Sequence, residues 1–248
     1  MTELLGKAAL VTGGSRGIGA AIVRRLARDG ADVAFTYVSA AGKAKAEAVV
    51  ADVAAAGRRS FAIQADAADA DAVREAVERA ARELGRLDIL VNNAGVYPYG
   101  PFEDVALEEL DRTLAIHARA AFVAGQAAVA HLPRGGRIVS IGSNLVHRAP
   151  FGGIVLYSMS KSALSGFTKA LARELGPRGI TVNAVHPGST DTDMNPADGD
   201  SSDFQRGMSA LGHYSNADDI AATVAHLVGP GGRTVTGAEF TVDGGTNA

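Results

Sequence analysis

The chain has 248 residues, of which 47% are hydrophobic and 21% charged, so it has enough apolar material for a large core and is not a disordered chain. It has no cysteine, which excludes disulfides, thiolate metal sites and cysteine nucleophiles. The net charge of −3, without a long run of one sign, favours neither a nucleic-acid surface nor a membrane anchor. No signal peptide or membrane-spanning apolar run is recognisable, so we expect a soluble, cytoplasmic protein.

A glycine-rich turn separates the first predicted strand from the first predicted helix. Residues 7–12 form a short apolar run, and Thr-Gly-Gly-Ser-Arg-Gly-Ile-Gly follows at 12–19, before a helical pattern. Strand, glycine turn and helix in this order are typical of a dinucleotide site, where the first amides of the helix face the phosphates. The alternative is an ordinary strand-to-helix turn, because Gly13, Gly17 and Gly19 do not have the usual G-x-G-x-x-G spacing.

The second predicted strand, 31–37, ends without an acidic residue. A carboxylate at this point would bind the ribose 2′-hydroxyl and select NAD. Tyr37 stands there instead, Ser39 follows it, and Arg16 of the glycine turn can reach the same region. A cation with hydroxyl groups suits a 2′-phosphate, so the sequence favours NADPH. The alternative for Arg16 is an ordinary surface arginine.

Polar and small residues follow the next two predicted strands. The strand at 59–64 leads to Asp66, which either caps the helix predicted over 69–84 or accepts a hydrogen bond from an adenine amino group. The strand at 87–91 runs into Asn-Asn-Ala-Gly at 92–95. Such residues at the carboxyl ends of strands line the crevice in which doubly wound sheets bind ligands.

Two reactive side chains lie one turn apart in the helix predicted over 153–175. Tyr157 and Lys161 are four residues apart, so they share one helix face. A nearby ammonium favours phenolate, so we expect it to lower the pKa of Tyr157 and ease proton transfer near neutral pH. Ser143, which follows the strand at 137–141, can hydrogen-bond the oxygen that Tyr157 protonates. Taken alone, Tyr-x-x-x-Lys describes two solvated helix residues.

Strands alternate with helices along the chain, which predicts an α/β fold: one doubly wound, Rossmann-type parallel sheet of about seven strands with helices on both faces. The strands are expected at 7–12, 31–37, 59–64, 87–91, 137–141, 180–185 and 238–242. Helices are expected after the glycine turn and at 43–56, 69–84, 107–132, 153–175 and 218–228. Because no linker or repeat is visible, we expect a single domain over 1–248, with a mobile polar flap at about 189–213.

The ordered motifs resemble the short-chain dehydrogenase/reductase family over essentially the whole chain. They are T-G-x-x-x-G-x-G at 12–19, N-N-A-G at 92–95, Ser143, Y-x-x-x-K at 157–161 and P-G at 187–188. Pro-Phe-Gly-Gly at 150–153 and Asp-Thr-Asp-Met-Asn-Pro at 191–196 make the chain most similar to bacterial NADPH-dependent ketoreductases of the 3-oxoacyl-carrier-protein reductase type. The resemblance implies a homotetramer, with the last strand and the long helices at its interfaces.

The resemblance also implies a role for each matching position. Tyr157 would be the general acid in ketone reduction, Lys161 would lower the tyrosine pKa and hold the nicotinamide ribose, and Ser143 would polarise the carbonyl. Contacts to NADP(H) are implied for both catalytic side chains of the helix and for Gly13, Ser15, Arg16, Gly17, Ile18, Gly19, Tyr37, Ser39, Asp66, Ala67, Asn93, Ala94, Gly95, Pro187, Gly188, Thr190 and Thr192.

One position departs from the family pattern. Members carry an asparagine in the helix after the fourth strand, which completes a proton relay through water to Lys161, whereas this chain has His117 there. Three interpretations are open: the histidine binds the same water, the relay is broken and turnover is slow, or a histidine titrating near pH 6.5 makes the relay pH-sensitive. Our hypothesis is an active enzyme with an altered relay, in which His117 belongs to the catalytic set.

These residues predict an NADPH-dependent oxidoreductase that reduces a hydrophobic ketone, such as a 3-oxoacyl compound, to a secondary alcohol. Tyr97, Leu145, Phe151, Val155 and the segment 194–208 are expected to line an apolar substrate pocket. One alternative is a nucleotide-binding regulatory protein with a decayed relay, since some relatives with similar 150–153 and 191–196 segments bind nucleotide signals. Another is a sugar or secondary-alcohol dehydrogenase that works oxidatively.

The remaining histidines carry less information. His147, four residues after Ser143, either faces the substrate or is a loop residue. The others are scattered without ligand spacing, so we expect no metal; they are His131, His186, His213 and His226.

Overall fold

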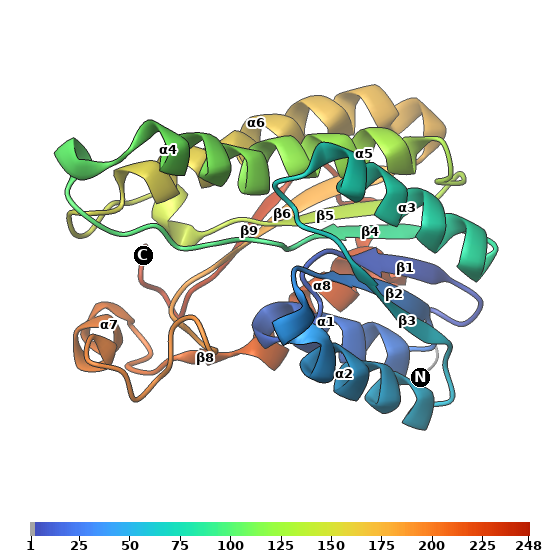
Figure 1. The fold of residues 1–248 in the computed structure, drawn as a ribbon, viewed down its shortest axis with the longest axis horizontal. Helices are drawn as coiled ribbons and strands as arrows, with labels where there is room; N and C mark the ends of the chain where they lie inside the picture. The colour runs from blue at the N-terminus through green and yellow to red at the C-terminus, as the bar shows by residue number, and fades with distance from the viewer. Residues whose placement is uncertain (1–2) are drawn as a thin grey trace.

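The computed structural model describes residues 3–248 and contains a seven-stranded parallel sheet in the order β3-β2-β1-β4-β5-β6-β9 (Figure 1). The strands are β1 Ala8–Val11, β2 Asp32–Tyr37, β3 Ser60–Gln64, β4 Ile89–Asn92, β5 Arg137–Ile141, β6 Thr181–Pro187 and β9 Glu239–Val242. Each predicted strand is confirmed to within two residues. The central strands β1 and β4 are buried along their whole length, which is why they are continuous apolar runs in the sequence.

Helices cover both faces of the sheet, as the Rossmann-type prediction requires (Figure 1). One face carries α1 Gly17–Arg28, α2 Lys43–Ala55 and α8 Ala217–Val228, and the other carries α3 Ala70–Leu84, α5 Ala120–Val129 and α6 Val155–Leu175. Successive strand residues point to opposite faces, so the two sides have separate apolar cores. Val11 packs on the first side, and Leu10 packs on the second.

The helix predicted over 107–132 is not continuous. It consists of α4 Leu107–Leu114 and α5, joined by a π-helical turn at Ala115–Arg119. The first three residues of this turn are buried and Arg119 is exposed, as on a regular amphipathic helix, so the sequence pattern gives no sign of the interruption. Single π-helical turns are frequent at functional sites, and this one contains His117.

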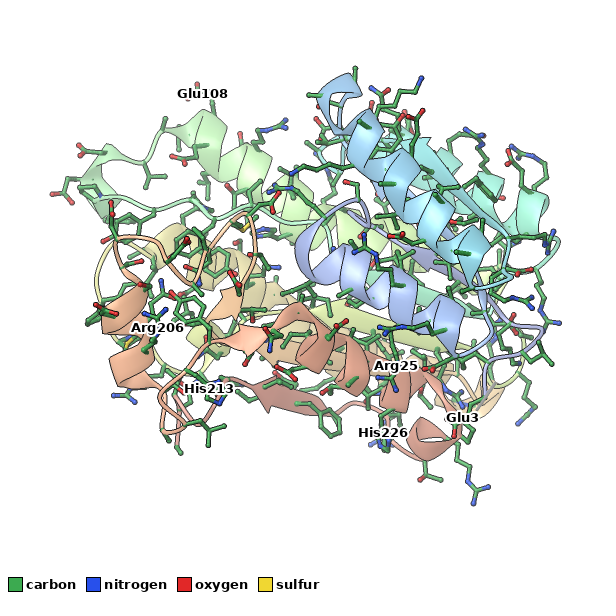
Figure 2. All side chains as sticks on the ribbon, turned by 90° about the horizontal axis from the view of Figure 1, so that it is seen from below. Glu3, Arg25, Glu108, Arg206, His213 and His226 are labelled. Atoms are coloured by element: carbon green, nitrogen blue, oxygen red, sulfur yellow. The ribbon has the colours of Figure 1, made fainter. Side chains whose placement is uncertain are left out.

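The segment at 189–213, expected as a flap, has secondary structure of its own. Strand β7 Thr190–Asp191 pairs in parallel with β8 Ser215–Asn216, and α7 Ser202–Met208 lies between them. Figure 2 shows Arg206 and His213 of this region at the opposite end of the molecule from Glu3 and Arg25. Within residues 3–248, none of the helices is both long enough and apolar enough to span a bilayer. The single-domain organisation stays a prediction.

Candidate active site

The glycine turn between β1 and α1 is held by the neighbouring strands. The Gly13 N–H donates to Thr36 Oγ1 at 2.9 Å, and Asn93 Nδ2 donates to the carbonyl oxygens of Thr12 and Gly13 at 2.9 and 3.1 Å. A Cβ on Gly19 would lie 2.2 Å from the Gly13 carbonyl oxygen, so only glycine fits there. Asn93, for which the resemblance implies a contact to NADP(H), uses its amide to hold this turn.

The turn presents hydrogen-bond donors at the carboxyl edge of the sheet. The first backbone N–H groups of α1 have no partners within the helix, and the exposed Arg16 lies directly before it. The neighbouring strand β2 ends at the half-buried Tyr37, and Ser39 follows. Unpaired helix amides, an arginine and hydroxyl groups suit phosphate, so this donor set fits the phosphates of a dinucleotide.

Asp66 is not a helix cap. Its Oδ1 accepts from the Ala68 N–H at 2.9 Å, and its Oδ2 pairs with Arg112 at 3.2 Å. The N-cap of α3 is Asp69, which accepts from two backbone N–H groups of the first turn. The capping alternative for Asp66 is therefore wrong, and its contact with adenine stays a prediction.

The residues after β6 reach the glycine turn from the other side. Pro187 ends β6, Gly188 follows it, and Thr190 begins β7. The Thr192 methyl lies against the turn, because a Cβ on Gly17 would be 3.3 Å from it. The structure thus brings the two predicted cofactor-binding segments together.

Ser143, Tyr157 and Lys161 meet at the carboxyl end of β5, as predicted. Ser143 lies two residues beyond β5, and the other two lie one turn apart in α6. The Ser143 hydroxyl lies near enough to the Tyr157 phenol to lower its pKa, although burial outweighs this effect. Lys161 Nζ donates to the Ile141 carbonyl oxygen at 2.9 Å, which ties α6 to the end of β5.

The pKa values in this cluster are set by burial. Burial raises the pKa of Tyr157, and the nearby Ser143 hydroxyl offsets only part of that effect. Burial also lowers the pKa of Lys161 to about 8. The expected lowering of the Tyr157 pKa is not found, because desolvation of the phenol is the larger effect and its pKa is raised.

His117 is buried and hydrogen-bonded through both ring nitrogens. The Val96 N–H donates to Nε2 at 3.0 Å, so the proton lies on Nδ1, which contacts Ser160 Oγ at 2.8 Å. Ser160 in turn donates to the Tyr157 carbonyl oxygen at 2.8 Å. Burial and the nearby Lys161 charge lower the pKa of His117 to about 3. The interpretation in which His117 titrates near pH 6.5 is therefore wrong.

A small cavity of about 20 Å³ lies beside Lys161 and His117, enough for about one water. Asn92 also lines it, and Asn92 Oδ1 is buried without a hydrogen-bond partner among the described residues. Gly95 lies close to both His117 and Lys161: a Cβ added to it would lie 3.2 Å from His117 Nε2 and 3.3 Å from Lys161 Nζ. A water in this cavity would meet an imidazole whose nitrogens already have protein partners.

Aromatic side chains surround Tyr157. The ring of Tyr97 meets it edge-on at 4.8 Å and stacks with Tyr99 at 6.2 Å. Phe151 meets Phe204 of α7 edge-on at 5.9 Å. Burial raises the pKa of Tyr97 to about 12, so it stays neutral beside the phenol. Tyr97, Phe151 and Phe204, all within the predicted pocket lining, thus belong to aromatic contacts, and one of these contacts joins the 150–153 segment to α7.

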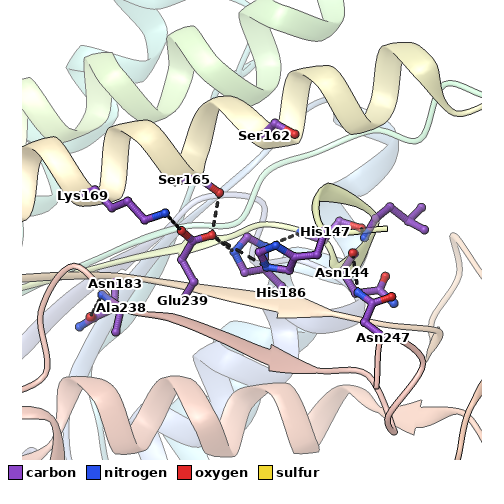
Figure 3. Close-up of polar contacts among 12 residues, drawn as sticks. Asn144, His147, Ser162, Ser165, Lys169, Asn183, His186, Ala238, Glu239 and Asn247 are labelled. Atoms are coloured by element: carbon purple, nitrogen blue, oxygen red, sulfur yellow. Dashed lines mark hydrogen bonds and ion pairs between the residues drawn. The ribbon is translucent and has the colours of Figure 1, made fainter. Parts of the chain in front are cut away.

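Sequence reasoning missed a polar cluster behind Ser143. His186, expected to stand apart, lies with His147 and Glu239, and their ligand atoms are within 4.8 Å of one another (Figure 3). The residues come from β6, a loop and β9, so only the pairing of β6 with β9 brings them together. Nothing in the local sequence marks this cluster.

Known proteins match the chain over its length. A family model described as enoyl-(acyl carrier protein) reductase matches residues 13–247. A short-chain dehydrogenase from Burkholderia cenocepacia J2315, crystallised with NADP, is 60% identical with a TM-score of 0.97, over 99% of this chain and 100% of that one. The chain belongs to the short-chain dehydrogenase/reductase family.

Two other family relatives differ in what their names record. A blue fluorescent protein from a metagenomic library, crystallised with NADPH, is 59% identical with a TM-score of 0.98, over 99% of this chain and 100% of its own. The cyclic-di-GMP-binding biofilm dispersal mediator protein of Escherichia coli K12 is 43% identical over 248 residues, which cover 100% of both chains. Membership of the short-chain dehydrogenase/reductase family therefore places the chain among oxidoreductases but does not identify its substrate.

Proposed function

We propose that the chain binds NADP(H) and reduces a ketone to a secondary alcohol. The observation that carries the proposal is the pair of Ser143 and Tyr157, which the fold places near each other at the end of β5, where the buried Lys161 donates to the Ile141 carbonyl oxygen. The pair lies at the sheet edge that also carries the glycine turn. The crystallised relatives bound to NADP and NADPH support the choice of cofactor.

The residues present fit this cofactor. The N-terminal amides of α1 would hold its phosphates, and Arg16 would pair with the 2′-phosphate, with Tyr37 and Ser39 nearby. Thr190 and Thr192 would approach from the segment after β6. When bound, the cofactor supplies the hydride that reduces the carbonyl carbon.

The chain's own residues protonate the carbonyl oxygen of the substrate and stabilise the charge that develops on it. Tyr157 has a raised pKa, so it is protonated at neutral pH and donates its Oη proton to the carbonyl oxygen. The Ser143 hydroxyl donates a second hydrogen bond to the same oxygen as negative charge develops there. Lys161, with a pKa of about 8, is mostly cationic at neutral pH and favours the phenolate that proton transfer leaves.

The proposed substrate is a hydrophobic carbonyl compound of the 3-oxoacyl kind. The aromatic contacts of Tyr97 with Tyr157, and of Phe151 with Phe204, support an apolar mouth to the site. Aromatic and apolar linings with few placed polar groups are typical of small-molecule sites.

The test is NADPH consumption by the purified protein with a panel of hydrophobic ketones. We expect Tyr157→Phe to reduce kcat by at least about 100-fold, because the proton donor at the carbonyl oxygen is lost. NADPH should still raise the melting temperature of this variant, and by more than NADH does. Equal turnover by Tyr157→Phe and wild type would contradict the proposal.

A nucleotide-binding regulatory role is the second candidate. Full-length similarity to a protein named for cyclic-di-GMP binding favours it, as do the His117 hydrogen bonds, which leave neither ring nitrogen for a relay water. Calorimetry with cyclic-di-GMP and with NADPH separates the two candidates. Cyclic-di-GMP binding by a wild type that turns over no ketone and oxidises no alcohol or sugar with NADP would favour the regulatory role.

A further inference from the structure

The backbone after β5 is held by β6 in two different ways. The Gly142 N–H donates to the Val185 carbonyl oxygen at 2.8 Å, which continues the pairing of the two strands. The next N–H, that of Ser143, donates to a side chain, His186 Nδ1, at 3.1 Å. The backbone of the proposed carbonyl-polarising serine is thus fixed by an imidazole.

His186 is fully buried and has one allowed arrangement of its proton. Because Nδ1 accepts from the Ser143 N–H, the neutral ring carries its proton on Nε2. That nitrogen lies 2.9 Å from Glu239 Oε2, so it donates to the carboxylate. Burial lowers the pKa of His186, which keeps the ring neutral.

Glu239 is held in turn by α6. Figure 3 shows it between the side chains of Lys169 and Ser165 on one side and the two histidine rings on the other. Lys169 Nζ lies 2.7 Å from Oε1, and Ser165 Oγ donates to Oε2 at 2.7 Å. Burial opposes ionisation of this carboxyl, but its hydrogen bonds from Lys169, Ser165 and His186 outweigh that effect and lower its pKa to about 2.

The ring of His186 also packs on the backbone of the segment it holds. A Cβ on Gly142 would lie 2.3 Å from His186 Nδ1 and 2.6 Å from Cε1. Position 142 therefore requires glycine, because any larger side chain would clash with the imidazole of His186. The Gly142 backbone in turn restricts rotation of that ring.

A metal ion fits this cluster less well than a chain of hydrogen bonds does. His147, His186 and Glu239 have the residue types of a zinc site. A metal on His186 Nε2 would move the proton to Nδ1, where it would face the Ser143 N–H as a second donor. Lys169 already occupies the other carboxylate oxygen.

We infer that His186 and Glu239 are positioning residues that hold Ser143 in place for its hydrogen bond to the carbonyl oxygen. The inference rests on the proposed function. Glu239 fixes the tautomer of His186, and His186 fixes the Ser143 backbone. The Leu145 N–H donates to Ser143 Oγ at 3.2 Å, so the serine oxygen is also oriented and its hydroxyl proton is available to the substrate.

The first test is a double-mutant cycle in the ketone assay. Ser143→Ala should lower kcat on the order of 100-fold, and His186→Phe about tenfold, because a displaced donor loses much of its effect. In the Ser143→Ala background, His186→Phe should change kcat by less than about twofold, since it acts through the serine. NADPH affinity should stay within about twofold in all variants. Independent, multiplicative losses would overturn the inference.

Two further variants separate positioning from loss of structure. His186→Asn keeps an acceptor near the Nδ1 position, so it should recover part of the activity that His186→Phe loses. Glu239→Ala should lower kcat in wild type but not in Ser143→Ala, and it carries the test if His186→Phe does not fold. The matched control is His131→Phe, because His131 has a similar 2.9 Å contact with Glu78 on the surface. It should leave kcat unchanged.

A second measurement does not depend on turnover. Long-range proton–nitrogen NMR spectra of the imidazoles should show His186 neutral, with its proton on Nε2, and Glu239→Ala should disturb that signal. A proton on Nδ1 would overturn the inference directly. A wild type that reduces no ketone would overturn the proposed function, and the positioning role with it. An active wild type with multiplicative losses would overturn the positioning role alone.

Discussion

The chemical state of His117 depends on its burial more than on its position in the helix. Its folded pKa is about 3 and its ordinary value is 6.5, so the unfolded chain binds the extra proton first as the pH falls. Stability linked to this residue is fully present above pH 6.5 and is lost as the pH falls toward 3, by about 1.4 kcal/mol per pH unit.

We therefore expect the free energy of unfolding of wild type to fall more steeply with pH than that of His117→Asn. Between about pH 7.5 and 5 the additional loss should be about 2 kcal/mol. Urea unfolding at several pH values measures it, and the other histidines contribute equally to both proteins. Parallel curves would mean that the folded protein protonates His117 readily.

A methyl group added at Gly142 tests how tightly the backbone after β5 packs against His186 of β6. In Gly142→Ala the new methyl would lie 2.3 Å from His186 Nδ1, and such overpacking costs about 1–3 kcal/mol of unfolding free energy. Urea unfolding measures the loss. Gly166→Ala is the matched control, because a Cβ there meets nothing within 4 Å and the change should stabilise α6 by up to about 1 kcal/mol.

At the level of elements, local rules predict some helix ends and miss a helix interruption. The helix predicted over 69–84 is found at Ala70–Leu84 with Asp69 as its N-cap and a left-handed Gly85 after it. The π-helical turn at Ala115–Arg119 has no such signal, because its buried and exposed side chains alternate as they would on a regular helix.

The start of α3 gives a stability prediction. Asp69 accepts from two backbone N–H groups of the first turn, so Asp69→Ala should lower the free energy of unfolding by about 1 kcal/mol. Asp71, whose side chain is 93% exposed and pairs with Arg74 at 2.8 Å, is the control. Asp71→Ala should cost at most about 0.5 kcal/mol. Similar losses in the two urea curves would contradict the capping role.

For the molecule as a whole, periodicity predicts the seven strands, and the motif order predicts which strand ends meet. The meeting of Ser143, Tyr157 and Lys161 could be predicted because Tyr157 and Lys161 are four residues apart in one helix and Ser143 comes two residues after the end of β5. The cluster of His186 with Glu239 does not, because the two residues are far apart in sequence and meet only through the pairing of β6 with β9. Burial also reverses the expected shift in the pKa of Tyr157, and burial depends on the complete fold.

Assembly is a further prediction at this scale. Leu107 and Phe122, on α4 and α5, are 71% and 57% exposed, and they lie on the long helical segment that the family resemblance implies at a subunit interface. We expect a homotetramer in light scattering and a smaller particle for Phe122→Glu. Leu5→Glu, at a similarly exposed residue outside the helices, is the control and should keep the wild-type mass. An unchanged mass for Phe122→Glu would exclude this surface.

Helix α6 carries Tyr157, Lys161, Ser165 and Lys169 at intervals of four residues. A residue inserted or deleted between them would rotate the later side chains by about 100° about the helix axis. Tyr157 would then no longer share a helix face with Ser165 and Lys169, which hold Glu239. Protein engineering aimed at new substrates should therefore keep the length of this helix constant. Diversity is better introduced at Tyr97, Phe151 and Phe204, which lie outside α6 and make aromatic contacts.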